Sequence, residues 1–124
     1  MLLLMLGGAL GTYARYALGK WVSSQPWAEG FPYGTLVINV SGSFILGLFV
    51  TLTTERFAVP GALTLRLAVA IGFVGAYTTF STFEFETLAL VQTETWLRAF
   101  GNAFGSLFAG FLAVWLGVLL GRLL

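Results

Sequence analysis

The sequence predicts an all-α membrane protein, a single domain of four transmembrane helices over residues 1–124. Hydrophobic residues make up 58% of the chain and charged residues only 9%, whereas about a quarter of a soluble domain is charged. The charged residues separate four long apolar spans, and a bilayer core needs about 20 apolar residues per helix. These spans do not alternate between apolar and polar residues, which disfavours a β-barrel.

The first two spans cover residues 2–21 and 30–54. The first lacks the basic start of a signal peptide, so we interpret it as a membrane segment. A polar connection containing Pro26 follows it. The second span has no charged residue, and Pro32 stands at its start, where a helix tolerates proline.

The third and fourth spans cover residues 64–91 and 99–121. Glycine, threonine and serine residues interrupt the second half of the third span, within residues 72–82. A helix broken at that depth frees main-chain carbonyl groups, which is tolerated only where protein buries them or they coordinate something. We therefore expect the third helix to be broken there, with carbonyl oxygens suited to a small hard cation.

The basic side chains are divided almost evenly between the two ends of such a bundle. One end carries Arg56, Arg66 and Arg122, and the other carries Lys20 and Arg98. Orientation normally follows a Lys/Arg excess on the cytoplasmic side, so two alternatives stay open. The chain inserts both ways and pairs as an antiparallel dual-topology homodimer, or its terminal amino group selects one orientation.

Small residues lie on four-residue ladders in the first and last spans, the first of which also contains Arg15, and this spacing lets helix backbones approach closely in lipid. We interpret them as packing seams within or between subunits. They are Gly7, Gly11 and Gly19 in the first span, and Gly101, Gly105 and Ala109 in the last.

The chain contains no His, Cys or Asp. This absence removes the catalytic triads, thiolate nucleophiles and zinc ligand sets on which many enzymes depend, so we expect no enzyme. The net charge of +1 indicates no nucleic-acid partner.

Arg15 and Asn39 are the polar residues of the first two spans that most need partners. A charge at the bilayer centre costs at least ~2.5 kcal/mol, so Arg15 either faces a vestibule for an anion or extends to the membrane surface. Asn39 either makes an interhelical hydrogen bond or turns an amide donor toward a permeating anion.

Aromatic and polar side chains of the last two spans suggest an anion path. Phe80 and Phe83 are three residues apart and share a helix face, and their ring edges carry partial positive charge. They line a pore or pack in a core. Asn102 and Ser106 form a polar stripe that lines a path or bonds between helices, while Glu84 and Glu86 are expected near the membrane boundary as solvated acids.

Three stretches occur in order along the chain: GGALGTYARY, GTLVINVSGSFILG and GFVGAYTTFSTFEFE. Together they resemble the CrcB/Fluc family of small fluoride channels. The resemblance implies a four-helix subunit of an antiparallel homodimer, in the inner membrane of a prokaryote, that exports cytoplasmic fluoride passively through two pores.

The resemblance also implies roles for individual residues. The fluoride pore is expected to be lined by Asn39, Thr79, Phe80, Thr82, Phe83 and Ser106. Arg15 and Glu86 belong to the vestibule. The main-chain carbonyls of Gly75 and Thr78 would hold a structural sodium ion at the dimer centre. Some relatives have tyrosine and serine where this chain has Asn102 and Gly110, which leaves the polar track of the last helix open.

Two other functions fit a small four-helix chain less well. A proton-coupled small multidrug transporter needs a membrane-embedded acid, and the first span offers Arg15 in its place. A non-conducting helper subunit would explain the packing glycines without explaining the donor-lined face.

Overall fold

The computed structural model describes residues 1–57 and 60–124, and this part of the chain is helical without a strand. The predicted all-α class is therefore confirmed. The α-helices are α1 (Leu2–Ser23), α2 (Tyr33–Thr51), α3 (Ala62–Arg66), α4 (Gly75–Tyr77), α5 (Phe80–Gln92) and α6 (Trp96–Leu123). A short 3-10 helix covers Pro26–Ala28, and π-helical segments cover Leu52–Arg56 and Leu67–Val74.

Three helical stretches of the described chain are long and apolar enough to cross a membrane: Tyr33–Arg56, Ala62–Gln92 and Trp96–Leu123. They coincide with the last three predicted spans. The helix of the second predicted span begins at Tyr33 and not at residue 30. Gly30 has a φ of 80°, and Pro32 lies just outside the helix as its N-cap.

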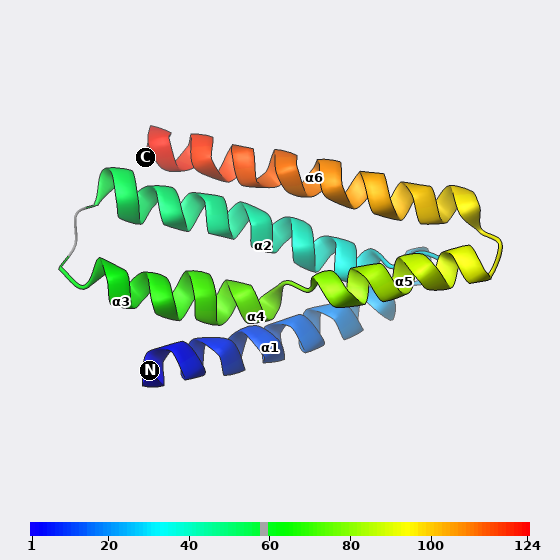
Figure 1. The fold of residues 1–124 in the computed structure, drawn as a ribbon, viewed down its shortest axis with the longest axis horizontal. Coiled ribbons are helices and arrows are strands. Elements are labelled where there is room, and N and C mark those ends of the chain that lie inside the picture. The colour runs from blue at the N-terminus through cyan, green and yellow to red at the C-terminus, as the bar shows by residue number, and fades with distance from the viewer. Residues whose placement is uncertain (58–59) are drawn as a thin grey trace.

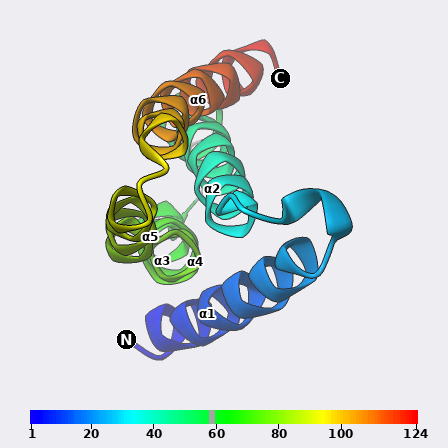
Figure 2. The same ribbon diagram turned by 90° about the vertical axis from the view of Figure 1, so that its right-hand side faces the viewer.

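The helices lie side by side along the long axis of the molecule (Figure 1). α2 lies between α6 and the α3 to α5 row, and α1 covers the other side of that row (Figures 1 and 2). Both termini and the start of α3 lie at one end, while the α5–α6 turn lies at the other (Figure 1).

Glycine allows α1 to pack closely on the π-helical segment Leu67–Val74. A Cβ atom on Gly7 would overlap the carbonyl oxygen of Ala68, and one on Gly11 would overlap that of Phe73. These two glycines therefore form a packing seam, as predicted.

The glycines of α6 that pack against another helix are not the predicted ones. Gly117 and Gly121 meet α2, at Phe44 and Thr51. A Cβ atom on Gly101 or on Gly105 would have no described atom within 4 Å, so the predicted ladder is uncovered in the single chain.

We expect Gly117→Ala to lower the free energy of unfolding by about 1–3 kcal/mol, the usual cost of overpacking. Its methyl group would meet the main chain of Phe44, which cannot move without shifting α2. Gly110→Ala is the matched control, because its methyl group would lie 3.7 Å from Ser43 Oγ, an ordinary contact. Unfolding in detergent, followed by circular dichroism, measures both; equal stability of the two variants would contradict the seam.

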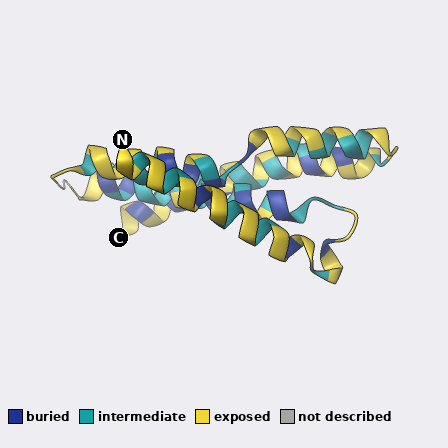
Figure 3. Cartoon of the chain, turned by 90° about the horizontal axis from the view of Figure 1, so that it is seen from below, coloured by how far each residue is buried: buried dark blue, intermediate teal, exposed yellow. Residues whose placement is uncertain are grey.

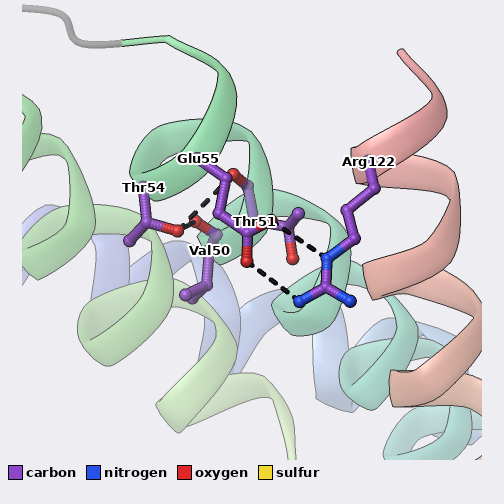
Figure 4. Close-up of polar contacts among 5 residues, drawn as sticks. All are labelled: Val50, Thr51, Thr54, Glu55 and Arg122. Carbon is purple, nitrogen blue, oxygen red and sulfur yellow. Dashed lines mark hydrogen bonds and ion pairs between the residues drawn. The ribbon is translucent and has the colours of Figure 1, made fainter.

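Two arginines form hydrogen bonds between helices at the end of the molecule that holds both termini. Arg122 donates two hydrogen bonds to Glu55, Nε to Oε2 at 3.0 Å and Nη2 to Oε1 at 3.2 Å (Figure 4). Arg66 donates to the hydroxyl and to the carbonyl oxygen of Thr53. These contacts join α6 and α3 to the π-helical end of α2.

Buried residues are confined to the surfaces where helices meet, and exposed residues cover the outer faces (Figure 3). α5 contains no buried residue over its length, Phe80–Gln92. Apolar packing within the single chain therefore holds α5 weakly.

Candidate functional site

The helical row is interrupted at Thr78 and Thr79, between α4 and α5. Both residues have extended backbones, with φ/ψ of −79°/158° and −149°/116°. In a continuous helix the Thr79 amide would donate to the Gly75 carbonyl. It donates instead to Asn39 Oδ1 at 2.8 Å, and Asn39 Nδ2 donates to the Thr79 carbonyl at 3.0 Å.

Asn39 thus pairs with both polar main-chain groups of one residue. An unpaired main-chain group away from water costs about 1–3 kcal/mol, so the carboxamide stabilises the interruption. One of the two Nδ2 hydrogens remains for another acceptor. The structural and the anion-binding interpretations of Asn39 are therefore compatible.

Thr79 also caps the start of α5. Its Oγ1 accepts a hydrogen bond from the Thr82 amide at 3.3 Å and donates to Thr82 Oγ1 at 3.0 Å. Thr79 is buried, whereas Thr82 is exposed. Because the Thr79 hydroxyl is already donating, the Thr82 hydroxyl is the donor that can turn outward.

Phe80 and Phe83 lie together on one face of α5. Their ring centroids are 5.9 Å apart and their planes are inclined by 45°. Phe80 is 74% exposed, and Phe83 is half-buried. The Phe80 ring therefore extends beyond the single chain.

A cavity of about 280 Å³ lies between α1, α2 and α5. It brings together four of the predicted site residues and Thr35. Its polar lining includes Arg15, Thr35, Thr79, Thr82 and Glu86. This gathering of residues from three helices, far apart in sequence, makes the cavity the candidate vestibule.

The two charged groups of this cavity have specific partners. Arg15 Nη1 donates to the Thr78 carbonyl at 3.4 Å, so the side chain faces protein. Thr35 Oγ1 donates to Glu86 Oε1 at 2.9 Å, while Oε2 is buried without a partner in the described chain. The expectation of a solvated acid is thus wrong for Glu86, because α2 covers it; Glu84 is exposed.

A second cavity, of about 370 Å³, is also bordered by Glu86 and lies between α5, α6 and the connection at Gly30. Arg98 Nη1 donates to the Gly30 carbonyl at 3.0 Å at its edge. Ser106, which was expected to line the pore, borders neither of these two cavities.

The polar stripe of α6 bonds to α5 instead. Asn102, only 2% exposed, donates through Nδ2 to Thr87 Oγ1 at 2.8 Å. Ser106 Oγ donates to Asn102 Oδ1 at 3.3 Å. The interhelical interpretation therefore accounts for Asn102.

Thr35 and Thr87 were not singled out in the sequence. Thr35 lies four residues before Asn39, so helical spacing would have placed it on the same face. Nothing in the sequence indicates that Thr87 pairs with Asn102, since that contact depends on the register between α5 and α6.

Comparison with known proteins shows the family of this chain. The family model described as "CrcB-like protein, Camphor Resistance (CrcB)" matches residues 2–118. The chain belongs to the CrcB family. This CrcB chain has several helices that are long and apolar enough to cross a membrane, so it is a multi-pass membrane protein.

Curated relatives of this CrcB chain carry the name "Fluoride-specific ion channel FluC". The protein from Methylobacterium radiotolerans is 48% identical over 82% of this chain and 69% of its own length. That from Acidobacterium capsulatum is 51% identical over 70% and 67%. That from Solibacter usitatus is 53% identical over 73% and 72%.

The donors that this CrcB chain offers to a cation are main-chain oxygens. The described residues contain no group of three or more His, Cys, Asp or Glu side chains that could hold a metal ion. The interruption takes the Thr79 amide away from the Gly75 carbonyl, and freed carbonyls of this kind can coordinate Na⁺. The Thr78 carbonyl, however, also faces the Arg15 guanidinium. Gly75 and Thr78 therefore fit a cation chemically, with Arg15 as a competitor.

Proposed function

We propose that the chain is a fluoride-selective channel that lets cytoplasmic fluoride leave the cell passively. The observation that carries this proposal is the interruption at Thr78 and Thr79, bridged by Asn39, in a chain whose relatives are named fluoride-specific channels. Beside the bridge the chain carries donors of three kinds: the Asn39 amide, the Thr82 hydroxyl, and the ring edges of Phe80 and Phe83 in the first turn of α5.

These donors suit a small, strongly hydrated anion. A selective pore must replace the ion's water shell with groups of its own. Asn39 has one amide hydrogen to spare, the Thr82 hydroxyl accepts from Thr79 and keeps its own hydrogen to donate, and Phe80 and Phe83 present ring edges with partial positive charge. Arg15 at the vestibule would attract anions toward them.

We further propose four transmembrane helices with a broken third helix, and an antiparallel pair of copies. Both termini lie at one end of the molecule (Figure 1), as an even number of crossings requires. The exposed Phe80 ring and the lack of buried residues in α5 suit a face that a second copy covers. The relatives are bacterial, which supports a location in the inner membrane of a prokaryote.

Where two copies meet, Gly75 and Thr78 of each would hold the structural sodium ion by their carbonyl oxygens. The ion would supply a positive charge that joins the two interrupted helices. Asn39 prepares this set by holding the Thr79 amide away from Gly75. We expect replacement of sodium by a bulky organic cation to weaken assembly or function.

The decisive experiment measures efflux from liposomes that contain the purified protein. Fluoride should leave and chloride should be retained, as followed with ion-selective electrodes. Equal efflux of the two halides would contradict selectivity. A rise in luminal pH on addition of a cationic drug outside the liposomes, as protons leave the lumen in exchange for the drug, would instead favour the multidrug transporter.

A further inference from the structure

We propose that Asn102 is a positioning residue that fixes the orientation of Phe83, acting through Thr87. The inference rests on the proposed function in so far as Phe83 lines the fluoride path. It assigns a role to a side chain that touches neither of the cavities described above.

α5 needs such a device because it carries both aromatic rings but has no buried residue. Side-chain hydrogen bonds tie α5 to other helices at three levels in the described chain. Asn39 holds Thr79 just before its start, Thr35 reaches Glu86 in its middle, and Asn102 reaches Thr87 one turn beyond Phe83. Only Asn102 comes from α6, which does not line the vestibule, and it therefore limits the rotation of α5 from a separate helix.

The Thr87 hydroxyl makes two hydrogen bonds, one as a donor and one as an acceptor. It donates to the Phe83 carbonyl at 2.8 Å and accepts from Asn102 Nδ2 at 2.8 Å. Residues four apart stack on one helix face, so this hydroxyl joins α6 to the helical turn that starts at Phe83. A sideways or rotational shift of that turn would break the contact.

Burial makes the contact costly to break. Asn102 is 2% exposed, and a buried amide without a partner destabilises the fold, because nothing replaces its lost hydrogen bonds to water. Ser106 donates to Asn102 Oδ1 at 3.3 Å, which fixes the orientation of the amide and directs Nδ2 toward Thr87. Ser106 thereby acts on the site without facing it.

The test places 4-fluorophenylalanine at position 83 and records its fluorine NMR signal in the full-length protein. Thr87→Val removes the hydroxyl at nearly constant shape, and Asn102→Leu removes the amide. Each should shift or broaden the signal, and the double variant should add little more. Thr87→Ser keeps the hydroxyl and should restore the wild-type signal. The same label at position 85, where the side chain is 73% exposed, should be unaffected.

Fluoride efflux from liposomes is the second measurement. Thr87→Val and Asn102→Leu should each slow it roughly two- to tenfold, the factor that corresponds to one hydrogen bond, whereas Thr87→Ser should not. If Asn102→Leu fails to assemble, Ser106→Ala offers a milder disturbance of the same amide and should broaden the position-83 signal.

An unchanged position-83 signal in Thr87→Val would overturn the proposal, as would equal changes at positions 83 and 85. The NMR comparison requires no transport. A wild-type protein that releases no fluoride would therefore reject the proposed function and still leave the positioning role to be decided by the signals.

Discussion

Asn39→Leu is expected to abolish fluoride efflux and to lower the free energy of unfolding by about 2–6 kcal/mol. The variant keeps the size of the side chain but leaves the amide and the carbonyl of Thr79 without partners. Each unpaired main-chain group costs about 1–3 kcal/mol, and water is not available in the membrane interior to replace the lost bonds. The interruption should then rearrange, and the donors around it should lose their common geometry.

Ser43→Ala is the matched control for this variant. Ser43 lies one turn after Asn39 on α2, and its hydroxyl makes no hydrogen bond within the described ranges, residues 1–57 and 60–124. The control should unfold like the wild type and should still release fluoride. Thermal unfolding in detergent and efflux from liposomes measure both variants; if Asn39→Leu behaves like Ser43→Ala, the carboxamide does not hold the interruption.

Phe80→Ile is expected to slow fluoride efflux at least about tenfold while leaving the fold of the subunit unchanged. The ring is 74% exposed, so its removal costs the single chain little packing. Isoleucine has no positively polarised ring edge to offer the anion, and a loss of about 1.4 kcal/mol at the barrier already gives a tenfold change in rate.

Phe85→Ile tests whether any exposed ring on α5 would have the same effect. Phe85 is 73% exposed but lies five positions further along the helix, well away from the face of Phe80. This control should conduct at the wild-type rate. Circular dichroism and size-exclusion chromatography verify that both variants fold and assemble. Equal losses of efflux in the two variants would reduce Phe80 to a packing residue.

The sequence was sufficient to predict the helical class and to predict that several of the site residues lie together. Apolar runs between charges predicted the helices because lipid imposes both length and composition. The glycine and hydroxyl pattern indicated residues 72–82 as the place for a break, and Thr78 and Thr79, whose backbones are extended, lie within this stretch. The pairing of copies, the sodium ion and the pore itself stay predictions.

The remaining features depend on how one helix approaches another. The sequence shows an amide at Asn39 but not that it binds both main-chain groups of Thr79. It shows a stripe in α6 but not that Asn102 turns to Thr87. It also marks Gly101 and Gly105 as a seam, although the glycine that meets α2 at Phe44 is Gly117, which was not singled out in the sequence.

The π-helical segment Leu67–Val74 makes the direction of Thr79 depend on the number of residues that precede it. A π-helix accommodates more residues per turn than an α-helix, and each residue of an α-helix turns the chain by about 100°. The loss of a single residue here would therefore turn Thr79 away from Asn39 without altering either of them. The number of residues in this segment, and not only their identity, sets the phase of the chain where it meets α2.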